Sequence, residues 1–158
     1  MKTSRYRFAY LAIGALLLAS ASWANELLVG AAAEHIRADD SMVIGGGIGP
    51  GTATGQEGEL RAVAVVVEKP KAGKVAIVAC DVLFVEKDFV DRALARIEKS
   101  TGIPASAVLV NATHTHHAPT TSTVHGYQRE EEFVRRVEDA IVLAVEAADG
   151  DCEDASMF

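Results

Sequence analysis

Two apolar runs separated by a short turn restrict the fold of this chain more than any other feature of its sequence. Residues 62–67 and 75–80 are rich in valine and alanine, and the stretch between them contains Pro70 and Gly73. Two such runs joined by a turn-rich connection predict an antiparallel β-hairpin. Strands that are apolar on both faces are typical of a layered α/β domain.

Helical patterns follow this hairpin. Apolar residues recur at helical spacing over residues 89–97 and again over residues 129–148, and Gly102 and Pro104 end the first pattern. Short apolar runs at residues 27–33 and 107–111 predict two further strands. We therefore expect an α/β fold, a layered mixed sheet with flanking helices.

The second predicted helix leads into residues 149–158, which begin with Asp149-Gly150-Asp151 and contain no further apolar run. In layered α/β folds a helix normally leads to the next strand. We expect residues 149–158 to form a disordered polar tail and the sheet to keep an open edge. Residues 25–148 are interpreted as an incomplete N-terminal part of a larger catalytic domain.

The N-terminus has the pattern of an export signal. Lys2, Arg5 and Arg7 precede an apolar run at residues 8–19, and Ser22-Trp23-Ala24 follows. This combination predicts a signal peptide over residues 1–24, and hence a periplasmic or secreted protein. The apolar run is shorter than the roughly 20 residues that span a membrane, so we expect no integral membrane segment after cleavage. An uncleaved anchor is the alternative.

Composition narrows the classes of partner and of covalent cross-link. A net charge of -7 gives no electrostatic reason to bind nucleic acid or anionic lipid headgroups, and a neutral or zwitterionic partner fits better. Cys80 ends an apolar run and Cys152 lies in the polar tail. We predict two free thiols and no disulfide.

Three histidines follow the strand predicted at residues 107–111. If the backbone stays extended, His114 and His116 point to one side and His117 to the other. Two imidazoles on one side can share a cation, or one can bind a metal while the other holds substrate. The alternative is a polar loop whose histidines only bond to neighbours, which is the favoured interpretation for the isolated His35 and His125.

A glycine loop, residues 45–51, precedes the hairpin. It contains neither a P-loop nor a dinucleotide-binding pattern, so a phosphate cradle is unsupported. Gly46 and Gly47 would let the backbone turn tightly or approach a substrate closely, although a merely flexible loop is also open. We expect His114 and His116 to lie near this loop.

Two other families that use a His-x-His pattern do not fit this sequence. The histidine pattern lacks the Asp-His continuation of metallo-β-lactamases, and the chain is too short for an amidohydrolase barrel.

Four segments carry a family resemblance: Leu28-Val29-Gly30, the Gly-rich stretch from Ile44 to Gly49, Ala79-Cys80-Asp81 and above all Asn111-Ala112-Thr113-His114-Thr115-His116-His117-Ala118-Pro119. In these segments the chain resembles the N-terminal region of the neutral/alkaline ceramidase family. The family pattern is Gly-Thr-His-Thr-His-Ser-x-Pro, so Ala112 and His117 depart from it. The resemblance implies a zinc hydrolase of sphingolipid metabolism that cleaves the amide of N-acylsphingosine (ceramide) to a fatty acid and sphingosine. It implies that His114 is a zinc ligand and that His116 lies beside the metal as a catalytic residue.

The resemblance also implies that the other zinc ligands, a histidine, a glutamate and a tyrosine, lie downstream in a longer chain. We therefore expect this chain to be truncated. The alternative is a non-catalytic exported module of the same origin that binds a lipid or a partner. Asp81, at a strand end, is a candidate for orienting a metal-bound histidine. A helix cap or a surface carboxylate is the alternative role for Asp81.

Overall fold

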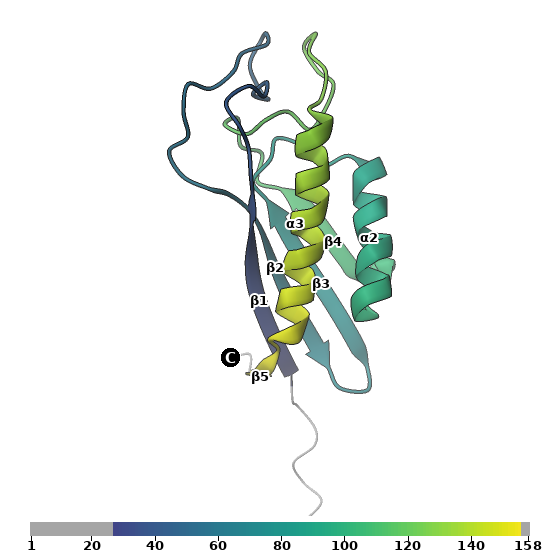
Figure 1. Ribbon diagram of the computed structural model, residues 1–158. Coiled ribbons are helices and arrows are strands. Elements are labelled where there is room, and N and C mark those ends of the chain that lie inside the picture. Colours follow the sequence, from purple (N-terminus) through teal and green to yellow (C-terminus); the bar gives the residue numbers. More distant parts are fainter. Residues whose placement is uncertain (1–26, 156–158) are drawn as a thin grey trace, which may run out of the picture.

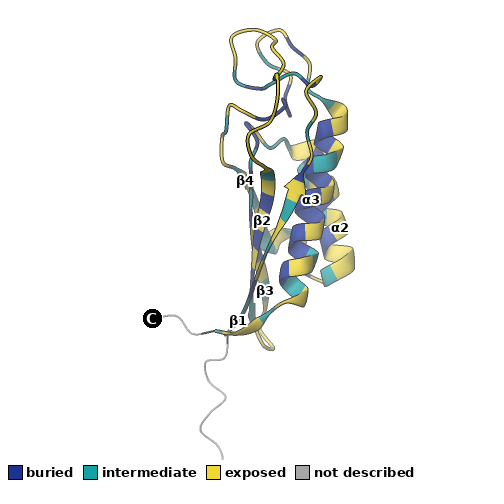
Figure 2. Ribbon diagram, turned by 60° about the vertical axis from the view of Figure 1, so that its left-hand side comes forward, coloured by how far each residue is buried: buried dark blue, intermediate teal, exposed yellow. Residues whose placement is uncertain are grey.

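The computed structural model describes residues 27–155, so the predicted signal peptide lies outside the described residues. These residues form one five-stranded sheet in the order β4-β3-β2-β1-β5, with two α-helices on one of its faces (Figures 1 and 2). In chain order the elements are β1 (Leu27–Ile36), β2 (Leu60–Lys69), β3 (Gly73–Cys80), α2 (Lys87–Thr101), the short 3-10 helix η1 (Ala105–Ala107), β4 (Val108–Ala112), α3 (Glu131–Gly150) and β5 (Glu153–Ala155).

The sheet is mixed, as the sequence predicts. Strands β2 and β3 form the expected antiparallel hairpin, with Val65 opposite Ile77. Helix α2 then crosses over, and β4 pairs with β3 in parallel. Gly102 ends α2 in the left-handed conformation, with φ of 74°, and its N–H donates to the carbonyl of Glu98. This is the helix stop that glycine supplies most readily.

The core lies between the sheet and the two helices. Ala64, Val66 and Val78 alternate along β2 and β3 on the covered face and are fully buried. Helix α2 meets them with a stripe spaced by four residues, and α3 buries a broader stripe centred on Phe133, Val137, Ile141 and Val145. Burying one such aromatic or branched side chain stabilises the fold by about 1.5–3 kcal/mol.

No described helix covers the opposite face of the sheet (Figure 2). This face carries exposed apolar side chains. The exposed members are Val63, Val65, Val75, Ile77 and Leu109. Strand β4 is the last strand on its side of the sheet in the described range, so the expected open edge is present there. Within residues 27–155 no helix is long and apolar enough to cross a bilayer.

The predicted disordered tail is wrong for residues 149–155. Helix α3 continues to Gly150, and β5 then pairs with β1, with Asp154 opposite Leu28. The unpaired edge of β1 presents backbone N–H and C=O groups, and a short polar strand satisfies some of them despite its low β-propensity. Strand β1 is also longer than predicted and reaches Ile36.

An ion-pair network joins the beginnings of the two helices. The guanidinium of Arg129 donates to the carboxylate of Asp88 at 2.8 Å, to Glu86 at 3.0 Å and to Glu131 at 2.7 Å. The hydrogen bond from Arg129 lowers the pKa of the Asp88 carboxyl to about 2. Arg129 thereby fixes α3 against α2 at the end of the domain where the loops lie (Figure 1).

Because its folded pKa is depressed, Asp88 adds stability that is fully present above about pH 4 and is lost as the pH falls through about 2. We predict that Asp88→Asn lowers the free energy of unfolding at pH 7 by at most about 1 kcal/mol, as expected for an exposed pair. The difference from the parent should vanish near pH 2. Urea unfolding across this pH range measures it, with Asp91→Asn, which loses only a contact to Lys87, as control. A constant difference at every pH would contradict this account.

Gly30 marks the closest approach of β1 to α3. A Cβ at Gly30 would lie 1.9 Å from the carbonyl oxygen of Ala148, a backbone atom that cannot move aside alone. We predict that Gly30→Ala lowers the free energy of unfolding by about 1–3 kcal/mol through overpacking. Chemical denaturation measures the loss. Gly51→Ala, where an added Cβ meets nothing within 4 Å, is the control, and equal stability of the two variants would rule out this packing constraint.

Candidate metal and substrate site

Three loops meet at one end of the sheet, opposite β5. Strands β1, β3 and β4 all run toward this end, and the segments that follow them lie together there (Figure 1). Open α/β sheets commonly bind ligands beyond the carboxyl ends of their strands. The loop after β1 contains the glycine loop. The loop after β4, residues 113–127, is the histidine loop.

Backbone hydrogen bonds join the glycine loop to the histidine loop. The N–H of Gly45 donates to the carbonyl of Ala118 at 2.9 Å, and the N–H of Thr120 donates to Val43 at 2.8 Å. Ile44 and Pro119 form an isolated antiparallel bridge between these two bonds. The expectation that both loops rise from the same end and lie together is therefore confirmed.

Gly46 is the point where the glycine loop touches a histidine. Its φ is +97°, and a Cβ there would lie 2.5 Å from Nδ1 of His116. Only glycine fits, for reasons of both backbone conformation and space. The hydroxyl of Tyr127 holds the loop, because it accepts from the N–H of Gly46 at 2.9 Å and donates to the carbonyl of Gly47 at 3.4 Å.

His114 and His116 lie side by side, with ring centroids 5.1 Å apart and planes at 79°. Both imidazoles are exposed. The predicted reason for their meeting is wrong, because the backbone is not extended: His114 has a φ of +63°. The left-handed turn at His114 brings the two rings together in place of strand alternation.

The ring of His114 is fixed in one orientation by the main chain. Its Nδ1 lies 2.9 Å from the carbonyl oxygen of Leu83. A carbonyl oxygen only accepts, so Nδ1 carries the proton, and the neutral ring then presents a lone pair at Nε2. The same arrangement orients metal-binding histidines in proteins generally. Phe84 packs edge-on against this imidazole, with ring centroids 5.3 Å apart.

Asp81 was a candidate for orienting His114, but the Leu83 carbonyl has that role. Its carboxylate accepts from the backbone N–H of Arg61 at 3.0 Å and from the hydroxyl of Thr113 at 3.2 Å. Nor does it cap a helix, since α2 begins after Glu86. Asp81 instead joins the start of β2 to the residue that precedes His114, so it holds the backbone of the histidine loop.

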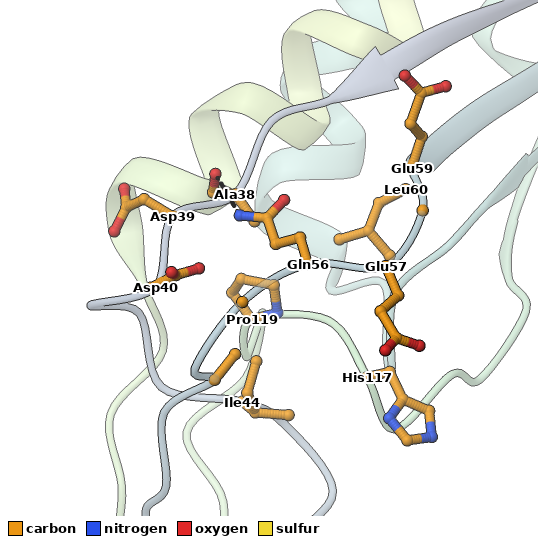
Figure 3. A pocket seen from close by; sticks show the side chains of 13 residues that line it. Ala38, Asp39, Asp40, Ile44, Gln56, Glu57, Glu59, Leu60, His117 and Pro119 are labelled. Atoms are coloured by element: carbon orange, nitrogen blue, oxygen red, sulfur yellow. Dashed lines mark hydrogen bonds between the residues drawn. The ribbon is translucent and has the colours of Figure 1, made fainter.

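The remaining histidines lie elsewhere. His117 lines a separate cavity of about 680 Å³ beneath the loop that follows β1. Figure 3 shows the carboxylates of Asp39, Asp40, Glu57 and Glu59 around the same cavity. His35 pairs with Glu59 at 3.2 Å. His125 lies in the tight turn between Val124 and Tyr127.

The two cysteines are free thiols, as predicted. Burial, with a smaller contribution from Asp81, raises the pKa of the Cys80 thiol to about 12. Cys80 therefore remains a neutral core residue and offers no thiolate to a metal. Among residues 27–155 no group of three or more His, Cys, Asp or Glu side chains is arranged to hold a metal ion. Within the described residues, His114 is one oriented candidate metal ligand, and His116 lies beside it.

Comparison with known proteins gives the same fold assignment. No family model and no curated protein sequence matches the chain. Two solved structures match over 82% of this chain: neutral ceramidase from Pseudomonas aeruginosa, with a TM-score of 0.73, and a ceramidase complexed with C2, with a TM-score of 0.71. The described chain has the fold of part of neutral ceramidase. Sequence identity to each is 22%, and the chain spans 22% of the length of each ceramidase.

Three residues that shape this site were not predicted from the sequence. Tyr127 holds the glycine loop, the Leu83 carbonyl orients His114, and Glu130 accepts from the N–H of Val43 at 2.8 Å. A backbone acceptor such as that of Leu83 leaves no side-chain signal. The aromatic residue at the end of the histidine loop was the one available clue to Tyr127.

We predict that Gly46→Ala displaces the imidazole of His116. The added Cβ would overlap the ring, and the positive φ would be strained by about 1–2 kcal/mol. In ¹H–¹³C NMR spectra the ring signals of His116 should move, while those of His35 should stay in place. Gly49→Ala adds a methyl group in open space and serves as the control. Unmoved His116 signals in Gly46→Ala would show that Gly46 does not set this contact.

Proposed function

We propose that this chain is part of a zinc-dependent amidase of the ceramidase type, which cleaves the amide bond of N-acylsphingosine to a fatty acid and sphingosine. The observation that carries the proposal is the contact between Nδ1 of His114 and the carbonyl of Leu83. This contact leaves Nε2 as an exposed donor in the place where the Thr-His-Thr-His resemblance expects a zinc ligand. The ceramidase fold of the chain supports the same assignment.

The donor chemistry of His114 fits zinc, which binds neutral imidazole readily. Zinc, when bound, supplies a water of lowered pKa and a polarised substrate carbonyl. A catalytic zinc takes about three protein ligands, so the ligands besides His114 would come from outside residues 27–155. In this proposal the coordination sphere would be shared between His114 and residues outside 27–155.

His116 has a different role in this proposal. It lies against Gly46 and beside His114 with its ring exposed, so it can donate a hydrogen bond to the substrate carbonyl or to the tetrahedral intermediate. Gly46 and Gly47 keep the backbone close to this ring without side chains that would fill the space. In this proposal His114 binds the metal, and His116 beside it contacts the substrate.

The surface charge agrees with a neutral amide lipid as substrate. A net charge of -7 disfavours nucleic acid and anionic headgroups. Export through the signal peptide at residues 1–24 is part of the proposal. The alternative is an exported module that binds a lipid or a partner without turnover. The absence of a three-residue metal group within residues 27–155 favours that alternative for this segment acting alone.

Zinc titration tests the proposal directly. We predict weak zinc binding by the protein in calorimetry, since one or two histidines cannot hold the ion tightly. His114→Ala should abolish this binding. His117→Ala should leave it nearly unchanged, because His117 faces the separate acidic cavity. Equal affinity of His114→Ala and the parent would remove His114 from the metal site.

Activity on a short-chain ceramide separates the amidase from the binding module. In a full-length ceramidase with the same Thr-His-Thr-His segment, replacing its first histidine by alanine should abolish hydrolysis while the protein stays folded. The residue at the position of His117 serves as the matched control and should retain hydrolysis after replacement by alanine. Retained hydrolysis without the first histidine would leave the binding module as the better assignment.

A further inference from the structure

The orientation of His114 depends on a segment that has no regular secondary structure of its own. Leu83 lies between β3 and α2, in residues 81–86, where neither a helix nor a strand fixes the direction of the carbonyl groups. The side chain of Leu83 is buried, at 3% exposure, and Val82 before it is fully buried. Burial of the side chains fixes where this segment lies, but changes in the backbone dihedrals can still turn a carbonyl group in another direction. A further contact is needed to aim the Leu83 carbonyl at His114.

The hydroxyl of Thr121 provides such a contact at the next residue. Thr121 is fully buried, and its Oγ1 donates to the carbonyl oxygen of Phe84 at 2.6 Å. This bond fixes the peptide that follows Phe84, one residue beyond the Leu83 carbonyl. Loss of this donor removes the hydrogen bond that the structure gives the Phe84 carbonyl. The Leu83–Phe84 segment would then relax toward another partner.

Thr121 is itself held firmly. Thr120, next to it, donates its N–H to Val43 at 2.8 Å and its hydroxyl to the carbonyl of Ser122 at 2.7 Å. The N–H of Glu130 donates to the carbonyl of Thr120 at 2.9 Å. Through Thr120, the backbone next to Thr121 is anchored to the loop after β1 and to the start of α3. The Thr121 hydroxyl therefore has a fixed position from which it can hold the segment before α2.

We propose that Thr121 is a positioning residue that sets the tautomer of His114. By holding the Phe84 carbonyl, it keeps the neighbouring Leu83 carbonyl on Nδ1 of His114 and the Phe84 ring against the imidazole. The proton then stays on Nδ1 and the lone pair stays on Nε2. The link between this contact and zinc binding rests on the proposed function. The effect of Thr121 on the tautomer of His114 does not.

The experiment compares the parent with Thr121→Val, which keeps the shape and removes the donor, and with Thr121→Ser, which restores the hydroxyl. The ¹⁵N and ¹³C shifts of the His114 ring in NMR spectra report which nitrogen carries the proton. We expect the Nδ1–H form in the parent, a mixture of tautomers in Thr121→Val and the parent form in Thr121→Ser. The ring of His35, which pairs with Glu59 outside the histidine loop, is the internal control and should not change.

Two results would overturn the inference: unchanged His114 shifts in a folded Thr121→Val, or a proton on Nε2 in the parent. The second result requires no variant, so the inference stays falsifiable if Thr121→Val does not fold. Zinc titration of the same proteins separates this inference from the proposed function. Loss of a group that orients a metal-binding histidine typically weakens metal affinity 10–100-fold, and we expect at least about tenfold for Thr121→Val.

A changed tautomer with no zinc binding by the parent would sustain the role of Thr121 and defeat the zinc proposal. If the parent binds zinc and Thr121→Val changes neither this binding nor the tautomer, the zinc proposal stands and the role of Thr121 is refuted.

Discussion

The packing of α3 on strands β1 and β2 is the constraint on which the rest of this domain depends. The helix contributes the largest group of buried side chains, and Gly30 lets its backbone approach β1 more closely than any residue with a Cβ would allow. Where α3 begins, Glu130 accepts from the N–H of Val43 and donates its own N–H to Thr120. The helix thus transmits the rigidity of the core to both loops of the site. A shift of α3 along the sheet would move the glycine loop and the histidine loop together.

Main-chain groups, more than pairs of side chains, build the site itself. Backbone hydrogen bonds join the two loops, a carbonyl orients His114, and a missing Cβ makes room for His116. Such contacts are indifferent to most side-chain substitutions, so the geometry can persist while the sequence changes. This gives a physical account of how a fold like that of ceramidase can be retained at 22% identity.

The elements with strong periodicity could be predicted from the sequence. The hairpin, both helices and the strand before the histidines follow directly from local patterns, because their apolar residues repeat at the spacing that burial requires. Strand β5 could not be predicted, since Glu153-Asp154-Ala155 has little intrinsic preference for a strand and pairs only because the edge of β1 is vacant. Gly46 and the two histidines carried visible signals. The positive φ of His114 and the carbonyl of Leu83 depend on contacts between distant segments, for which local sequence gives no sign.

The direction of α3 separates the histidine loop from the C-terminal strand β5 by the length of the helix. Its 20 residues run from the histidines to the far end of the sheet, where β5 adds to β1 (Figure 1). At 1.5 Å per residue this displacement is about 30 Å. A segment that joined β5 to the loops around His114 would have to cover the same distance. The uncovered face of the sheet around Val65 and Ile77 lies between these two ends, so a segment that packed on it would remove these apolar side chains from water.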